Sequence, residues 1–315
     1  MSASPPFHGL SAALLQGRRA GMAMAAIGAI AFSGKAIVVK LAYQHGVDAV
    51  TLLMLRMLLA LPFFLVLAWV AGWGKPALSR RDWLGIAWLG FTGYYAASFL
   101  DFAGLVYISA GLERLILYLN PTLVVALNWL LYRKRVHPWQ VLAMLISYAG
   151  VLLVFGMEAS LQGSHVVWGS TLVLGSAISY AFYLVYSGQL VQKLGALRLV
   201  GLASVVASVL CIGQFVLSRP LDSVWLVTAP VWWLSVFNAI FCTVIPILLV
   251  MMAIERIGSG MAAQVGMIGP LSTIGLGIWI LDEHFSWVLV LGTALVMAGI
   301  LLFSRWSLKV PASRP

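Results

Sequence analysis

Long runs of apolar residues, separated by short polar segments, dominate the chain from end to end. A helix needs about 20 apolar residues to cross a bilayer. The pattern predicts ten spanning helices, at residues 20–41, 50–71, 83–104, 110–131, 138–155, 167–190, 199–217, 230–254, 259–281 and 285–304. The connections near Ile108 and Gly258 are very short, which predicts two tight antiparallel hairpins. The expected fold is therefore an all-α membrane protein with ten transmembrane helices.

Composition agrees with a chain that meets little water. Hydrophobic residues make up 62% of the 315 positions and charged residues only 9%, against about 25% charged in soluble domains. No stretch remains that is long enough for a separate soluble domain. The apolar run after Arg18 and Arg19 is long enough to span, so it is expected to stay as the first helix and not to be a cleaved signal. Cys211 and Cys242 both lie in apolar runs and suggest neither a disulfide nor a metal site.

Basic residues beside the spans account for the net charge of +10. We therefore expect no nucleic-acid partner. If the N-terminus is cytoplasmic, 14 basic residues lie in cytoplasmic segments and only Lys40 and Arg219 on the other side. Such an excess sets orientation, so both termini are expected in the cytoplasm of a multi-pass protein of the bacterial inner membrane. Tryptophans near span ends fit membrane interfaces: Trp69, Trp73, Trp83, Trp139, Trp168, Trp225, Trp287 and Trp306.

The two halves of the chain align without a gap when one is shifted by 149 positions. Trp83 then meets Trp232, and Pro121 meets Pro270. Five spans per half is an odd number, so the second half enters the membrane inverted, as in many secondary transporters. The expected division is an N-terminal cytoplasmic segment 1–19, a first repeat 20–155, an external linker 156–166, a second repeat 167–304 and a cytoplasmic tail 305–315.

Two equivalent segments carry a family resemblance: SAGLERLILYLNP at 109–121 and GSGMAAQVGMIGP at 258–270. With the polar corner that follows each, they resemble the drug/metabolite transporter (DMT) superfamily, and in it the EamA-type ten-helix carriers. Glu283 matches the usual glutamate at this corner, whereas Lys134 departs from it. The chain is most similar to bacterial exporters of aromatic amino acids of the YddG type. The resemblance implies export of small organic molecules by alternating access.

Five charged residues fall inside the expected spans, where charge is costly and usually functional. These residues are expected to form a polar vestibule in which Lys35 or Arg56 binds a substrate carboxylate. Asp101 or Glu113 is a candidate for carrying a coupling proton. The alternative is that these groups pair with one another and hold helices together. Arg114 is expected to extend its charge toward the membrane interface.

Polar and aromatic side chains within the spans form the candidate substrate site, because phenol and amide groups suit a largely apolar cavity. They are Tyr94, Tyr95, Ser98, Tyr118, Asn120, Tyr180, Tyr183, Asn238, Thr243 and Gln264. Pro121 and Pro270 are candidate hinges, since a proline inside a helix removes a backbone hydrogen bond; the alternative is a kink that serves packing alone. Tyr118 and Gln264 flank these prolines.

Several chemistries lack their signature in the sequence. No glycine-rich phosphate loop with Lys-Ser/Thr is present, and the five histidines are scattered without metal-ligand spacing. We therefore expect no enzyme, no cofactor and no metal, and a chain that works as a monomer with membrane lipid and a small-molecule substrate as its partners. A broader metabolite or drug efflux carrier, or an intramembrane enzyme acting on lipid-linked substrates, are the alternatives.

Overall fold

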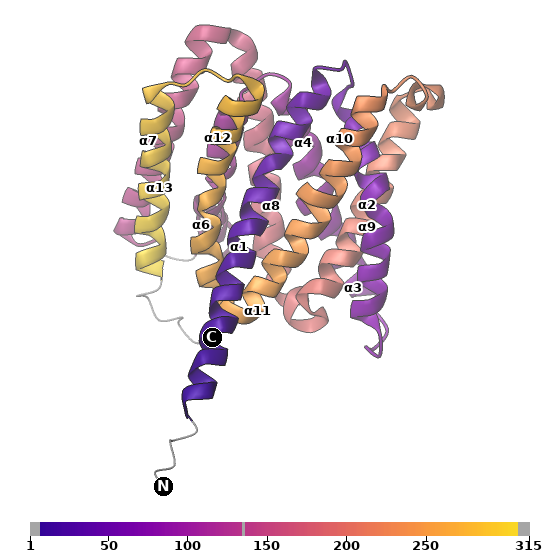
Figure 1. The fold of residues 1–315 in the computed structure, drawn as a ribbon, viewed down its shortest axis with the longest axis vertical. Helices are drawn as coiled ribbons and strands as arrows, with labels where there is room; N and C mark the ends of the chain where they lie inside the picture. Colours follow the sequence, from indigo (N-terminus) through magenta and orange to yellow (C-terminus); the bar gives the residue numbers. More distant parts are fainter. Residues whose placement is uncertain (1–6, 134–135, 308–315) are drawn as a thin grey trace.

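The computed structural model describes residues 7–133 and 136–307, and the regular secondary structure of this part of the chain is helical, with no strand (Figure 1). The helices are α1 (Phe7–Tyr43), α2 (Ala49–Gly72), α3 (Arg80–Leu89), the π-helix η1 (Gly90–Ala96), α4 (Ala97–Leu105), α5 (Ala110–Leu117), α6 (Asn120–Tyr132), α7 (Pro138–Gln162), α8 (Ser164–Leu194), α9 (Ala196–Ser218), the 3₁₀-helix η2 (Leu221–Val224), α10 (Ala229–Ala239), the π-helix η3 (Ile240–Val244), α11 (Ile245–Gly266), α12 (Ile268–Leu281) and α13 (Trp287–Ser307).

Eight helical segments of the described chain are long and apolar enough to cross a membrane. They are Gly17–Tyr43, Ala49–Gly72, Ala110–Tyr132, Pro138–Leu161, Ser164–Gly188, Ala196–Ser218, Ala229–Ile254 and Gln264–Leu281. Trp287–Phe303 is a shorter apolar helix. The chain is therefore a helical membrane protein.

The connections differ in part from those expected. Ile108 lies in the turn between α4 and α5, and Gly258 takes φ 78° and ψ 157°, where the chain reverses direction inside α11. Such a positive φ suits glycine. The expected linker 156–166 is almost wholly helical, because α7 runs on to Gln162 and α8 begins at Ser164, with only Gly163 (φ 77°) between them. A glycine here turns the chain in one residue.

Helices from opposite halves of the sequence pack side by side. Helix α1 contacts α11 and α12, and α8 contacts α4 and α6, while α2 packs on α9 and α7 on α13. The α7–α13 pair is close because of two glycines: a Cβ on Gly150 would lie 2.5 Å from the carbonyl oxygen of Gly292, and one on Gly292 would lie 2.8 Å from that of Gly150. Small residues permit such helix contacts in membranes.

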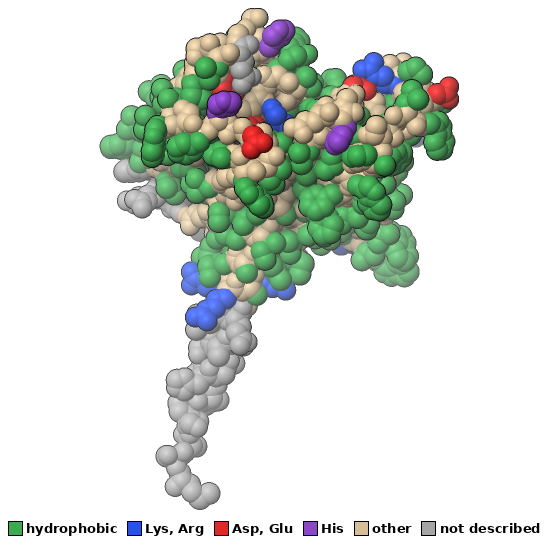
Figure 2. All heavy atoms as spheres, turned by 45° about the horizontal axis from the view of Figure 1, so that its top comes forward, with side chains coloured by type: hydrophobic (Ala, Val, Ile, Leu, Met, Phe, Trp, Pro, Cys, Tyr) green, Lys and Arg blue, Asp and Glu red, His purple; other side chains and the backbone are tan. Residues whose placement is uncertain are grey.

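The outside of the bundle is apolar, as a lipid-facing surface requires. Figure 2 shows hydrophobic side chains around the sides, with acidic and histidine side chains gathered at one end and basic side chains at both ends. Seven of the tryptophans expected at membrane interfaces are exposed: Trp69, Trp73, Trp83, Trp139, Trp168, Trp225 and Trp287. The eighth, Trp306, has a side chain outside the described part.

Several departures from regular helix geometry come in pairs related by the 149-residue shift. Gly46 and Gly195 both have positive φ, and so do Arg133 (φ 51°) and Asp282 (φ 53°). The π-helix η1 overlaps η3 after the same shift. The helix break before α6 likewise corresponds to the break at Met267 before α12. These irregularities of one half thus recur in the other.

Candidate functional site

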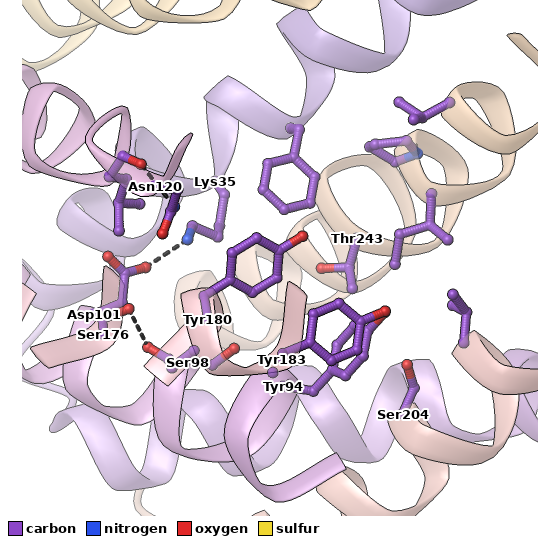
Figure 3. A pocket seen from close by; sticks show the side chains of 18 of the residues that line it. Lys35, Tyr94, Ser98, Asp101, Asn120, Ser176, Tyr180, Tyr183, Ser204 and Thr243 are labelled. Atoms are coloured by element: carbon purple, nitrogen blue, oxygen red, sulfur yellow. Dashed lines mark hydrogen bonds and ion pairs between the residues drawn. The ribbon is translucent and has the colours of Figure 1, made fainter. Parts of the chain in front are cut away.

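A cavity of about 450 Å³ lies where the two halves meet. Its walls come from α1, α2, η1, α4, α5 and the start of α6 in the first half and from α8, α9, η3 and α11 in the second. Figure 3 shows charged and serine side chains (Lys35, Asp101, Ser98, Ser176) on one side and a group of tyrosines on the other. The cavity therefore has a charged end and an aromatic end.

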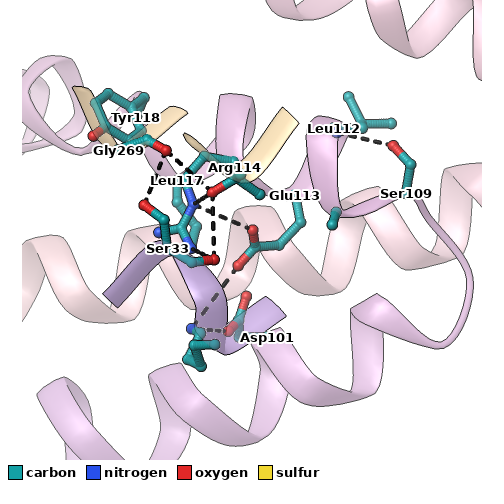
Figure 4. Close-up of polar contacts among 12 residues, drawn as sticks. Ser33, Asp101, Ser109, Leu112, Glu113, Arg114, Leu117, Tyr118 and Gly269 are labelled. Atoms are coloured by element: carbon teal, nitrogen blue, oxygen red, sulfur yellow. Dashed lines mark hydrogen bonds and ion pairs between the residues drawn. The ribbon is translucent and has the colours of Figure 1, made fainter. Parts of the chain in front are cut away.

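The charged end is built around a carboxylate–ammonium contact. The Lys35 Nζ atom lies 2.5 Å from Asp101 Oδ2 and 3.9 Å from Glu113 Oε1, and Glu113 Oε2 lies 3.7 Å from Arg114 Nε (Figure 4). All four side chains are almost inaccessible to solvent. Attraction between these charges offsets the cost of removing them from water. The network joins α1, α4 and α5.

Arg114 crosses from the first half of the chain to the second. Its Nε donates a hydrogen bond to Thr273 Oγ1 on α12 at 3.1 Å, and its Nη2 donates to the carbonyl oxygen of Ser33 on α1 at 3.4 Å. The expectation that Arg114 extends to the interface was wrong. Helix α5 packs against α12 and α1, so this side chain points into the protein, where acceptors are in reach.

Arg56 occupies the same end of the cavity without a carboxylate partner. It is 5% exposed, its Nη2 donates to Ser98 Oγ at 3.0 Å, and its guanidinium lies 4.7 Å from the ring centroid of Phe102. A cation over an aromatic ring gains some electrostatic stabilisation. The Arg56 Nε atom has no hydrogen-bond partner, so this guanidinium keeps an unused donor.

Three tyrosines form the aromatic end. Tyr94 and Tyr183 share a hydrogen bond between their hydroxyl groups at 3.2 Å and pack edge to face at 5.3 Å, while Tyr180 stacks on Tyr183 at 5.4 Å. The Tyr183 ring has room because Gly93 has no side chain: a Cβ there would lie 2.5 Å from Tyr183 Cγ. Tyr94 and Gly93 lie on η1, and π-helices often occur at functional sites.

Both expected hinges lie just after a break in a helix. Helix α5 ends at Leu117 and α6 starts at Asn120, so Pro121 sits in the first turn of α6, where a proline removes no helical hydrogen bond. Pro270 is in the first turn of α12. The hydroxyl of Tyr118, in the first break, donates to the carbonyl oxygen of Gly266, beside the second, at 3.0 Å. Asn120 Nδ2 donates to the Leu117 carbonyl at 2.7 Å.

The structure brings ten of the candidate residues to the cavity wall: Lys35, Arg56, Tyr94, Ser98, Asp101, Tyr118, Asn120, Tyr180, Tyr183 and Thr243. Glu113 is fully buried behind the wall. Tyr95 stacks on Phe99, Asn238 is buried with both amide atoms unpaired, and Gln264 is exposed. These four, and Pro121 and Pro270, are not among the lining residues.

Other lining residues were not predicted from the sequence, among them Phe32, Met57, Phe64, Gly93, Ser176, Ser187, Ser204, Pro246 and Met251. The spacing of polar residues could have indicated two of them, Ser176 and Ser187. Ser176, Tyr180, Tyr183 and Ser187 follow at intervals of three and four residues, which places them on one face of α8. The apolar residues carry no such signal, since they resemble their lipid-facing neighbours.

No group of three or more histidine, cysteine, aspartate or glutamate side chains is placed to hold a metal ion within residues 7–133 and 136–307, as far as their side chains are described. The polar groups of the cavity are instead suited to noncovalent binding. They offer a guanidinium, hydroxyls and an amide around an apolar space, as small-molecule sites do.

Comparison with known proteins gives the class of the chain. Residues 19–156 and again residues 167–305 match the EamA-like transporter family. The uncharacterized transporter YcbK of Bacillus subtilis (strain 168) is 30% identical over 285 residues, covering 87% of this chain and 89% of the relative. An uncharacterized transporter of Archaeoglobus fulgidus is 24% identical over 276 residues, covering 86% of this chain and 92% of the relative.

The fold has a solved counterpart as well. A crystal structure that is 18% identical superimposes with a TM-score of 0.64 and covers 93% of this chain and 100% of its own. At this identity the likeness concerns the fold alone. The two family matches cover most of the sequence, and the chain belongs to the EamA-like transporter family of the DMT superfamily.

Proposed function

We propose that the chain is a secondary transporter that exports aromatic and other hydrophobic amino acids by alternating access of two inverted five-helix halves. The observation that supports this best is the cavity between the halves, with buried charges at one end and Tyr94, Tyr180 and Tyr183 at the other. An amino acid with an apolar side chain has the same division into a charged and an aromatic or aliphatic part. Sites of this kind lie at the repeat interface of many carriers.

The inverted repeat is supported by the recurrence of backbone irregularities and by the helix contacts. Exchanging the halves turns the contact between α1 and α11 into that between α8 and α4, and the contact between α1 and α12 into that between α8 and α6. Tyr94 and Thr243 occupy equivalent positions, and both line the cavity. We propose repeats at residues 20–155 and 167–304, which rock about this shared site.

Ten spans fit the helices if two further segments are added to the eight long apolar ones. The helices α3, η1 and α4 follow without a gap from Arg80 to Leu105 and would contain the third span, residues 83–104, and α13 would make the last. An even number of spans brings both termini to one side, which the excess of basic residues assigns to the cytoplasm. In Figure 1 the first turns of α1 and the last turns of α13 lie toward the same end of the bundle. The membrane would be the bacterial inner membrane.

Two alternatives lead to different observations. A broader metabolite or drug efflux carrier would transport substrates without the amino-acid group, including cationic drugs. An intramembrane enzyme on lipid-linked substrates would change its substrate chemically. The relatives are described as transporters, which favours a carrier of either kind.

The test is flux through the purified protein in liposomes loaded with labelled phenylalanine, tryptophan, methionine or threonine. We expect protein-dependent release of the label, and unlabelled aromatic amino acids should compete with it. Loaded liposomes without the protein should release none, and liposomes with a Tyr118→Ala variant should release less. Absence of flux with all four amino acids would exclude the proposed substrates. Product analysis of the released label distinguishes transport from chemical conversion.

A further inference from the structure

The charges around the cavity do not balance. Lys35, Arg56 and Arg114 are cations, whereas Asp101 and Glu113 are the acids next to them. Lys35 is 2.5 Å from Asp101, and Arg114 is 3.7 Å from Glu113. No ion pair of Arg56 within 4.0 Å is recorded for the described side chains. One positive charge is therefore left over, and it is located on Arg56.

A buried guanidinium of this kind is costly unless something compensates it. Burial of an unpaired charge in a medium of low polarity is strongly unfavourable, and inside a membrane it usually marks a functional site. Hydrogen bonding to Ser98 and the ring of Phe102 compensate Arg56 in part. Its Nε has no partner. An anion that enters the cavity supplies both the missing charge and the missing acceptor.

Lys35 is a poorer candidate for this role than Arg56. Its ammonium is already in contact with Asp101, and Glu113 lies on the same side at 3.9 Å. Asp101 Oδ1 has no hydrogen-bond partner, which offers an ammonium group an acceptor. However, the negative charge of Asp101 is matched by Lys35. An added ammonium would restore the excess of positive charge that a carboxylate removes.

We propose that the cavity selects its substrate by the carboxylate, which Arg56 binds, and that the ammonium group of an amino acid is not required. This inference rests on the proposed transport of amino acids through the same cavity, and it extends the substrate class to aromatic carboxylates without an amino group. Tyr94, Tyr180 and Tyr183 bind the ring. Cationic aromatic compounds bind more weakly, because they add positive charge to a site that already has a surplus of it.

Four ligands with the same ring separate the two groups: phenylalanine, 3-phenylpropionate, phenethylamine and phenylalaninamide. Binding to the full-length protein in detergent is measured as the shift of its thermal unfolding, followed by tryptophan fluorescence. We expect phenylalanine and 3-phenylpropionate to stabilise the protein. Phenethylamine and phenylalaninamide should bind at least about tenfold more weakly, since they lack the charged acceptor. Equal binding of phenethylamine and 3-phenylpropionate would overturn the inference.

Binding of the same four ligands to variants tests whether Arg56 is the residue that binds the carboxylate. Arg56→Gln should weaken both carboxylates about 10- to 100-fold and should bind the two amines no more weakly than the wild type does, because the surplus positive charge that repels them is removed. Arg56→Lys should retain part of the carboxylate affinity. If Arg56→Gln does not fold, Ser98→Ala, which removes the hydroxyl that orients the guanidinium, should weaken the carboxylates about threefold to tenfold. Unchanged carboxylate affinity in a folded variant contradicts the inference.

The outcome is separable from that of the proposed function. Binding of 3-phenylpropionate without any flux of amino acids would refute amino-acid export and leave the carboxylate site standing. Flux of phenylalanine with equally good competition by phenethylamine would support export and refute the carboxylate site. A protein stabilised by none of the four ligands would refute both.

Discussion

The hydroxyl of Tyr118 donates a hydrogen bond to the carbonyl oxygen of Gly266 at 3.0 Å, and this contact ties the break before α6 to the break before α12. The two breaks are equivalent in the two halves of the chain. A carbonyl beside a helix break lacks its usual partner, and here the other half supplies the donor. A motion that separates the two breaks has to stretch or break this bond.

Tyr118→Phe tests the bond with little change in shape. It removes about 1 kcal/mol of hydrogen bonding, so the population of conformations in which the two breaks separate should rise about fivefold. Distances between spin labels at Trp129 on α6 and Trp279 on α12, both exposed, report this change. Tyr148→Phe is the matched control, because the Tyr148 hydroxyl makes only a 3.5 Å contact with Thr122. An unchanged distance distribution in Tyr118→Phe would show that the bond does not restrain the halves.

The contact also depends on Gly269. A Cβ at this position would lie 2.7 Å from the Tyr118 hydroxyl and 3.0 Å from Ser33 Oγ, whose side chain donates to the Gly269 carbonyl. Gly269→Ala should therefore displace Tyr118 and lower the initial rate of phenylalanine flux at least about tenfold, with a cost of about 1–3 kcal/mol from overpacking. Gly266→Ala is its control, since nothing lies within 4 Å of a Cβ there. Equal flux in the two variants would exclude a role for this close contact.

The pair of Lys35 and Asp101 should respond differently to single and double substitution. Asp101→Asn leaves the buried Lys35 without its nearest partner, and losing one member of a buried pair typically costs about 3–5 kcal/mol. Replacing both residues, as in Lys35→Met with Asp101→Leu, removes both charges and should recover much of the loss. Thermal unfolding followed by tryptophan fluorescence measures each free energy. A double variant less stable than either single variant would contradict this account of the pair.

Sequence patterns predicted the helical membrane fold because it depends on simple quantities. The length and polarity of apolar runs decide whether a helix can span, and Trp83 with Trp232 and Pro121 with Pro270 recur with the repeat. Candidate residues such as Tyr94 and Tyr183 were visible because polar groups are rare within spans. Their arrangement in space, including the hydrogen bond between Tyr94 and Tyr183, could not be predicted from the sequence.

The remaining features depend on contacts between distant parts of the chain. Arg114 was expected at the interface, because a sequence does not show that Thr273, far along the chain, offers it an acceptor. The continuation of α7 through the expected linker depends on Gly163 making the turn alone. Asn238 and Gln264 look equivalent as amides within spans, but one is buried and the other exposed. Which face of a helix meets the cavity is decided by packing.

Asp82 links α3 to the end of α8 and gives stability a defined dependence on pH. Hydrogen bonds from Lys193 and from Ser79 lower the pKa of Asp82 from 3.8 to about 2. Because this pKa is lower in the folded protein, the stabilisation is present above about pH 4 and is lost as the pH falls toward 2. The melting temperature of the wild type should exceed that of Asp82→Asn at pH 7, and the difference should shrink below pH 4. Lys193→Met should reduce the same difference, whereas a gap that stays constant down to pH 2 would refute the assignment.

At the end of the bundle opposite the first turns of α1, three carboxylate and ammonium groups surround the start of α5. Glu283 accepts a hydrogen bond from the Ala110 amide at 2.8 Å and lies 3.9 Å from Lys40. Glu158 accepts from the amide of Ser109 at 3.2 Å and from its hydroxyl. Acidic groups at a helix start satisfy its free amides and its dipole. These contacts join α1, α5, α7 and the segment between α12 and α13 at this end of the bundle.

Glu283→Ala should therefore favour opening at this end. A cysteine introduced at Ser176, on the cavity wall, with Cys211 and Cys242 replaced by alanine, reports access to a membrane-impermeant maleimide applied from that side. Loss of a charge-assisted bond worth about 1.5–3 kcal/mol should raise the labelling rate at least about tenfold. Asp222→Ala is the control, because Asp222 lies on exposed η2 at the same end. If labelling of Ser176→Cys is equally slow with and without Glu283, the carboxylate caps a helix but does not close the cavity, and the closure has to come from helix packing alone.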